Sequence, residues 1–393
     1  MASTQAELFL AAAAARSGLL GRPARRVLVV GAGRDGGSPS ALRRLAARTG
    51  GFDAVLVPGH PGDAAAAVAA AHPDLPGAGP ELVVGATALR TGRALARRWV
   101  DAPVTLLAAG AAAYGPTPEA LEGRLAPRVG AVLHLDLVPG LAPLLLSERG
   151  TPTRPVPVAA HRELVAALPA PGPVVAPATL VLGHRSAWSG ALEAGQGDEL
   201  LVALVERCAE AGHSRIVLLV DPDAAPRTRR LLAKAARDAR ADLRVVDDGG
   251  PVEPWCALPG TGLVVGCGTE DLLVARAVLG RRVAQLDTER VLKHLDPYAD
   301  PRRPGATLVG ATVPDLRSWT SSPEGEEPGP VDLEGLLGTV AYAMAPTLLA
   351  ARRGAAIDFL EANPGLRRRY VRKRRLSALR LPGGKRKVRP TLD

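Results

Sequence analysis

The sequence is poor in aromatic residues, cysteine and lysine, and each shortage excludes something. Aromatic residues make up 3% of the 393 positions, so alanine, valine and leucine must fill the cores. The three cysteines, Cys208, Cys256 and Cys267, have no CxxC spacing, so no thiolate metal site is expected and the chain predicts a disulfide-free protein. Five lysines stand against 44 arginines, a usage typical of a GC-rich genome.

Long apolar runs are also missing. Residues 164–183 have the length of a membrane span but contain four prolines. Residues 335–351 contain Pro346 and fall short of the roughly 20 residues that a span needs, so we predict a buried, kinked helix there. The short apolar run at 8–15 follows Glu7 and has no basic residues before it, so no signal peptide is expected and the protein is predicted to be cytoplasmic.

The net charge of +10 is concentrated at one end. Residues 365–393 hold 12 basic residues and one acidic residue, while the rest of the chain has a net charge of −1. This distribution argues against a nucleic-acid groove across the fold and indicates a local basic appendage. The basic segment is expected to be a solvated or partly docked helix, or to contact an anionic membrane surface or an acidic glycan, which would place the protein peripherally at the inner membrane face.

Short apolar runs alternate with helical segments in two series. The predicted strands have continuous rather than alternating hydrophobicity, which indicates parallel sheets covered on both faces. A proline-rich stretch separates the two series, so we predict two Rossmann-like, doubly wound α/β domains facing a cleft. The predicted parts are an N-terminal domain (1–150), a linker (151–177), a C-terminal domain (178–320), C-terminal helices (331–363) and a basic tail (364–393).

A G-x-G-x-x-G pattern follows the predicted strand at 27–30, at Gly31, Gly33 and Gly36. Dinucleotide binding needs a helix that opens within this loop and an acidic residue after the second strand. Here the helix is predicted from Pro39, and Pro58, Gly59 and His60 follow the second strand. A plain glycine-rich turn therefore fits better than a dinucleotide-dependent oxidoreductase.

Several longer blocks carry a resemblance. They include LVLGH at 180–184, LRVVDD at 243–248, GLVVGCGTEDLLVARAVLGRRVAQL at 262–286 and PYADPRRPGATLVGATVPDL at 297–316. Further blocks are LHLDLVPGLAPLLLSERG at 133–150 and RRRYVRKRRLSALRLPG at 367–383. Together they resemble the bacterial alpha-2,8-polysialyltransferase family. The resemblance implies a glycosyltransferase B (GT-B) fold and metal-independent transfer of sialic acid from a CMP-linked donor to a glycan.

The positions that the resemblance makes catalytic are replaced. Its acidic-Gly pair is matched by Ala109-Gly110, and its His-Pro pair by Asp221-Pro222. A methyl group cannot accept a proton, and a carboxylate about 4 Å from a phosphate costs roughly 4 kcal/mol at an effective dielectric of about 20. The donor-side positions are Gly183, His184, Asp221, Pro222 and the loop Gly266, Cys267, Gly268, Thr269 and Glu270.

Structural roles compete with functional ones at these positions. Asp221 and Thr269 are residue types that stabilise turns and helix caps at strand–helix junctions. A loop histidine such as His184 is commonly exposed to solvent without a function. Trp188 and Trp255 either stack on a ligand or pack, and Asp136 and Glu148 are the other acids near the predicted cleft.

Three functions remain open from the sequence. The first is a transferase-family protein that has lost catalysis and acts as a binding partner. The second is an active transferase that uses another nucleotide sugar. The third is the oxidoreductase. The expected partners are a nucleotide sugar or a glycan, with no nucleic acid.

Overall fold

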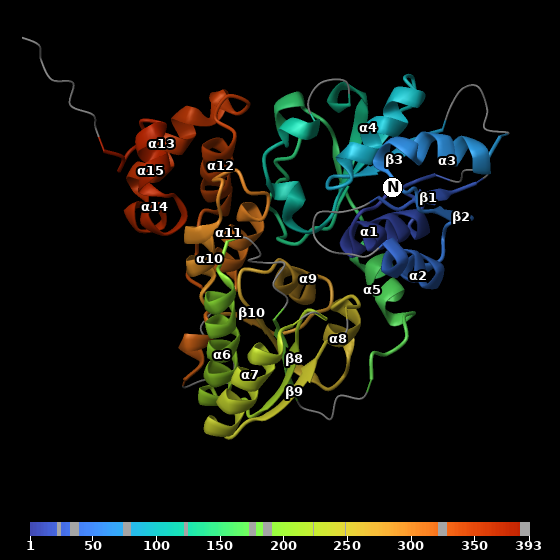
Figure 1. Ribbon diagram of the computed structural model, residues 1–393. Coiled ribbons are helices and arrows are strands. Elements are labelled where there is room, and N and C mark those ends of the chain that lie inside the picture. Colours follow the sequence, from blue (N-terminus) through green and yellow to red (C-terminus); the bar gives the residue numbers. More distant parts are fainter. Residues whose placement is uncertain are drawn as a thin grey trace, which may run out of the picture.

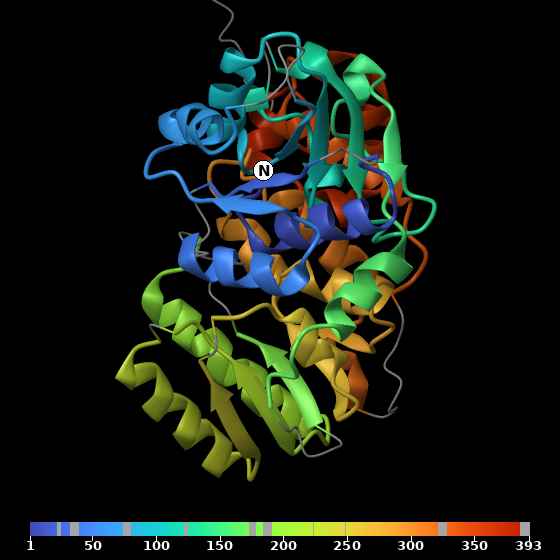
Figure 2. The same ribbon diagram turned by 90° about the vertical axis from the view of Figure 1, so that its right-hand side faces the viewer.

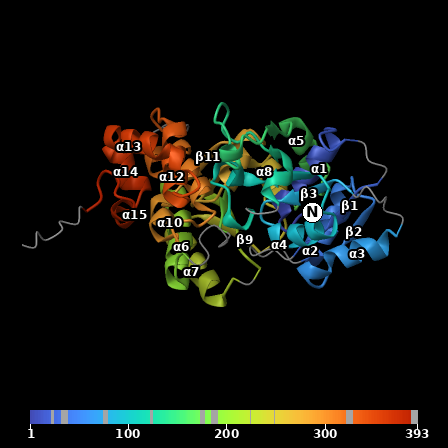
Figure 3. The ribbon, with the colours of Figure 1, turned by 90° about the horizontal axis from the view of Figure 1, so that it is seen from above.

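The computed structural model describes residues 1–21, 25–31, 39–73, 80–121, 125–172, 178–183, 191–222, 224–247, 249–320 and 328–385. Two α/β units lie one above the other in Figures 1 and 2, and a group of C-terminal helices lies beside the upper unit. Seen from above in Figure 3, those helices are at the far side of the molecule from β1 and β2. One large cluster of buried apolar residues runs through both units.

The N-terminal unit is built on parallel strands. Two strands form one pair, and four more form a second sheet in the order β3-β4-β5-β6. The first three residues join the two sets: the Ala2 N–H donates to Val29 O (3.1 Å), and the Gly85 N–H donates to Met1 O (3.1 Å). Residues 1–3 therefore lie between β1 and β3. The strands are β1 (Val27–Val29), β2 (Ala54–Leu56), β3 (Leu82–Gly85), β4 (Val104–Ala108), β5 (Val129–His134) and β6 (Thr153–Pro155).

Helices cover this layer. The first helix begins at a Thr4 cap whose side chain accepts the Glu7 N–H, and it is buried from Glu7 to Ala15, which explains its run of alanines. The fourth buries one face and places Arg97 and Arg98 in its last turn, where cations favour the helix dipole. The helices are α1 (Gln5–Arg16), α2 (Pro39–Thr49), α3 (Ala64–Ala71), α4 (Leu89–Arg98) and α5 (Val158–Ala166).

The C-terminal unit holds one parallel sheet in the order β11-β10-β7-β8-β9. Its central strand β7 is buried at all five positions, as a strand covered on both faces requires. The strands are β7 (Ala178–Leu182), β8 (Arg215–Leu219), β9 (Asp242–Val246), β10 (Thr261–Gly266) and β11 (Val283–Gln285). The helices are α6 (Ala194–Glu210), α7 (Pro226–Asp238), α8 (Glu253–Ala257), α9 (Asp271–Ala277) and α10 (Thr288–His294).

The remaining helices are α11 (Arg303–Thr312), α12 (Leu333–Met344), α13 (Arg353–Ala362), α14 (Pro364–Tyr370) and α15 (Lys373–Ala378). The expectation of one kinked helix through Pro346 is wrong, because α12 ends at Met344. A proline disfavours helical geometry in the residue before it, and Ala345 has left the helical region at φ −130°. In the ranges that the structure describes, no helix has both the length and the apolar character of a membrane span.

The basic segment is docked as far as residue 385. Tyr370, Val371, Leu376 and Leu381 are buried in the main core. Arg375 donates from Nε to Ala343 O (2.6 Å), and the fully buried Arg303 donates to the carbonyls of Leu292, Leu295 and Tyr298. Guanidinium groups thus bond to backbone carbonyls near helix ends, and the docked form of the predicted basic helix is the one observed.

Candidate functional site

The carboxyl ends of the two sheets meet at one contact. The chain leaves β4 through Ala109 and enters a short 3-10 helix, η2 (Gly110–Tyr114). From the other unit, the turn between β10 and α9 brings Glu270 across, and its Oε2 accepts the Ala111 N–H at 2.7 Å. In open α/β sheets, ligands bind outside the carboxyl ends of the strands. The contact therefore lies where a ligand between the two units would be expected.

Glycines shape a recess for this carboxylate. Gly110 has φ +57°, and a Cβ built there would lie 1.9 Å from Glu270 Oε1. A Cβ on Gly305 in α11 would lie 3.3 Å from Oε2. Glu270 itself is only partly buried. Two glycines and a backbone N–H thus hold a carboxylate that keeps some access to solvent.

The turn that carries Glu270 is fixed by its own contacts. Gly268 has φ +61°, and its N–H donates to Thr288 Oγ1 at 3.1 Å. The Thr269 hydroxyl donates to Asp271 Oδ2 at 2.8 Å, which agrees with a turn and capping role for this threonine. Cys267 is fully buried, and burial raises the pKa of its thiol, so it is not a reactive thiolate. The turn therefore positions Glu270 rigidly.

The other donor-side positions lie at the ends of β7 and β8. Gly183 lies in a tightly packed place, because a Cβ there would lie 2.8 Å from the Leu201 and Leu218 side chains. Asp221 lies two residues after the end of β8, and its carbonyl accepts the Ala224 N–H at 3.0 Å. Pro222 lies against the backbone at Gly249. His184 and Trp188 lie outside the described residues.

A second carboxyl group, which was not expected from the sequence, lies in the first turn of α1. Glu7 is fully buried and accepts hydrogen bonds from the Ser3 N–H (2.8 Å), the Ser3 hydroxyl (3.1 Å) and the Thr87 N–H (2.7 Å). It fills the start of α1, where a Rossmann-type unit would bind a phosphate. The pattern Thr4-x-x-Glu7 is a capping-box signal that could have found it.

This arrangement weighs against the dinucleotide interpretation. The strand before Gly31 is β1, which lies beside the central segment 1–3 and is not itself central. The Glu7 carboxyl group bonds both to Ser3 in that segment and to Thr87 after β3. Gly33 and Gly36 lie outside the described residues.

The remaining candidates have structural surroundings. Glu148 accepts the Thr117 hydroxyl (3.1 Å), and that hydroxyl oxygen accepts the Leu146 N–H (2.8 Å). Trp255 is 2% exposed, so it packs in the core and offers no stacking face. Asp136 is partly buried beside the β5 end. Over the described ranges, no three His, Cys, Asp or Glu side chains gather in a way that would hold a metal ion.

Comparison with known proteins gives likeness of structure only. No protein-family model and no curated protein matches the sequence. A glycosyltransferase from Rickettsia africae ESF-5 is similar in structure at 12% identity and a TM-score of 0.42, over 92% of each chain. The structure of LpCGTa in complex with UDP is similar at 15% identity and a TM-score of 0.47, over 92% of this chain and 93% of that one. A-type ketoreductases from a modular polyketide synthase reach 17% identity and a TM-score of 0.24 over 88% of each chain.

At these values the likeness says nothing about function, which rests on the site itself. The two units, each built on parallel strands with helices beside them, confirm the two-part α/β architecture that the sequence predicts.

Proposed function

We propose that this chain is a glycosyltransferase that binds a nucleotide sugar between its two units, with Glu270 as the general base. The observation that carries the proposal is the Glu270 carboxylate, which accepts the N–H of Ala111, two residues after Ala109. Position 109 is where the polysialyltransferase resemblance calls for an acid. Glu270 returns a carboxylate to the same place from the opposite unit.

The chemistry is a displacement at the anomeric carbon. The acceptor hydroxyl loses its proton to the carboxylate as its oxygen forms the new glycosidic bond, and the bond between the sugar and the nucleotide phosphate breaks. A positioned base contributes about 10²- to 10⁴-fold to such a step. The Ala111 N–H donates to Oε2, and this contact orients the carboxylate between the two units.

The identity of the donor nucleotide sugar depends on Asp221. The resemblance suggests CMP-linked sialic acid, but Asp221 stands at its His-Pro position. A carboxylate facing the donor phosphate opposes binding by roughly 4 kcal/mol at about 4 Å. We therefore propose a nucleotide sugar other than a CMP-linked one, bound with its phosphate away from Asp221.

Loss of catalysis is the second candidate, favoured by Ala109 and by the use of Glu270 in a contact between the units. In that case the protein binds a nucleotide sugar or glycan without turning it over. Glu270→Gln separates the two candidates, because only an active transferase loses rate when the base loses its charge.

The test of binding is a thermal-shift panel of nucleotides and nucleotide sugars, with Asp221→His beside the wild type. A ligand at about 100 times its Kd stabilises the native state by about 2.7 kcal/mol, which a melting curve resolves. We expect at least one non-CMP nucleotide sugar to shift the wild type, and Asp221→His to gain a CMP response. A panel that moves neither protein contradicts the proposal.

We also propose that the docked basic helices associate with an anionic membrane surface at the inner face of the membrane. Arg368, Lys373 and Arg374 remain exposed on α14 and α15. Binding to vesicles that contain anionic lipid should fall as salt is raised, and should weaken when these three residues become glutamine. Equal sedimentation of wild type and variant would exclude a role for this surface.

A further inference from the structure

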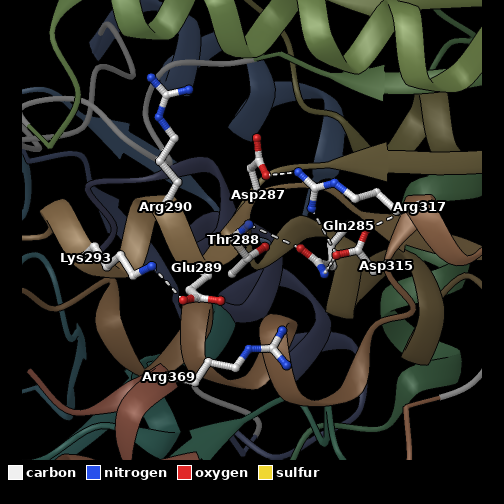
Figure 4. Close-up of a pocket in the computed structure, with 9 residues that line it drawn as sticks. All are labelled: Gln285, Asp287, Thr288, Glu289, Arg290, Lys293, Asp315, Arg317 and Arg369. Carbon is white, nitrogen blue, oxygen red and sulfur yellow. Dashed lines mark hydrogen bonds and ion pairs between the residues drawn. The ribbon is translucent and has the colours of Figure 1, made fainter.

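A separate pocket of about 270 Å³ lies at the carboxyl end of β11. Its walls come from four segments that are distant in the chain: the end of β11, the helix α10, the 3-10 helix η7 (Leu316–Thr320) with the residues before it, and α14. Figure 4 shows the side chains that surround it. None of the residues assigned to the Glu270 contact lines this pocket.

Three of the four cations on the walls are already paired. Arg317 contacts both Asp287 and Asp315, which raise the pKa of its guanidinium, and Lys293 pairs with Glu289 at 2.7 Å. Arg290 pairs at 3.1 Å with Glu199, which does not line the pocket.

Arg369 differs from these three cations. Within the described ranges it has no carboxylate partner, and its Nε is shielded from solvent without a hydrogen-bond acceptor. Figure 4 draws no dashed line to it. Its guanidinium lies 5.3 Å from the centre of the Tyr370 ring, and that ring is buried. The group is therefore held in place at the pocket wall with its charge uncompensated.

The other lining groups restrict what fits beside that charge. The carboxylates of Asp287, Glu289 and Asp315 accept hydrogen bonds and donate none, so they favour hydroxyl groups on a ligand. A guanidinium with free donors is suited to a phosphate or carboxylate. With four cations and three carboxylates, the walls carry a formal charge of +1, so an anion is preferred.

We propose that this pocket binds a small phosphorylated polyhydroxy compound, with the phosphate against Arg369 and the hydroxyl groups toward Glu289 and Asp287. The volume of about 270 Å³ is suited to a compound of the size of a sugar phosphate. The site is distinct from the cleft, but the pocket residue Thr288 accepts the Gly268 N–H from the turn that carries Glu270.

Calorimetric titration of the full chain with glucose 1-phosphate tests this proposal, with glucose as the uncharged control. We expect saturable binding of glucose 1-phosphate, no heat from glucose, and weaker binding at 500 mM than at 50 mM salt. Arg369→Gln should weaken binding about 10- to 100-fold. The matched control is Arg368→Gln, which removes an exposed charge one residue away in the same helix and should leave the Kd within twofold.

Because Arg369 packs on Tyr370, its loss could perturb the fold, so a second variant is needed. Lys293→Gln removes an exposed cation and leaves Glu289 without its partner, which should also weaken phosphate binding several-fold. The proposal is overturned if glucose 1-phosphate does not bind saturably, or if Arg368→Gln weakens binding as much as Arg369→Gln. Nucleotide-sugar binding in the cleft does not depend on either variant, so the two tests succeed or fail separately.

Discussion

Gly110→Ala tests the contact between the two units directly. The new methyl group meets two obstacles: a backbone at φ +57°, and Glu270 Oε1 at 1.9 Å from the built Cβ. The left-handed conformation costs a non-glycine residue roughly 1–2 kcal/mol. Moving the carboxylate away breaks its hydrogen bond to the Ala111 N–H, which is worth roughly 1.5–3 kcal/mol for a charged acceptor. The free energy of unfolding should therefore fall by about 3–5 kcal/mol.

Urea denaturation followed by circular dichroism measures this loss of stability. Two controls separate the cost of the backbone conformation from the cost of displacing Glu270. Gly150→Ala carries the same backbone strain at φ +63° with no atom within 4 Å of its Cβ, so it should lose only about 1–2 kcal/mol. In a Glu270→Ala background, Gly110→Ala should cost no more than Gly150→Ala, because the obstructing side chain is gone. If Gly110→Ala costs the same with and without Glu270, the reasoning about this contact is wrong.

Three further predictions concern buried groups. Burial, and secondarily the charge of Asp271, raise the pKa of Glu253 to about 7, so the free energy of unfolding falls as the pH rises from 4.5 to 7. In urea titrations, Glu253→Gln should be more stable than wild type by about 3 kcal/mol at pH 8 and by little at pH 4.5. Burial lowers the pKa of His161 to about 4, so the free energy of unfolding falls by up to about 3 kcal/mol as the pH drops from 6.5 to 4. His161→Phe should remove that fall. If the variant is as pH-sensitive as wild type, protonation of His161 is not its cause. Gly183→Ala places a methyl group 2.8 Å from two leucine side chains and should lower the melting temperature. The matched control is Gly195→Ala at an exposed position with no atom within 4 Å of the new Cβ, and it should not lower the melting temperature.

The regular parts of the fold are readable in the sequence because each strand is a short continuous apolar run between turn residues. The strand predicted at 27–30 extends one residue beyond β1, and the helix predicted from Pro39 begins at that residue as α2. Segment 1–3 was missed because three residues, one of them Ser3, carry no pattern of their own. Their place is decided by β1 and β3, which pair with them.

The site was predictable only in part. Sequence reasoning chose Gly110 and Glu270 separately, as positions at opposite edges of a cleft. Their contact joins residues 160 positions apart, and it depends on a positive φ at Gly110 that no local sequence pattern predicts. Docking of the basic segment was one of the alternatives expected from the sequence, but its partners were not predictable, because its arginines bond to backbone carbonyls that no side-chain pattern marks.

The central claim is that Glu270 is the base of a glycosyl transfer in this cleft. Its most direct test is the single-turnover rate of sugar release or transfer from whichever nucleotide sugar binds, compared between wild type and Glu270→Gln. The amide can still accept the Ala111 N–H, so the Kd of the donor should stay within about twofold, while the rate should fall about 10²- to 10⁴-fold. An unchanged rate, or a wild type that binds the donor and never turns it over, would contradict the account.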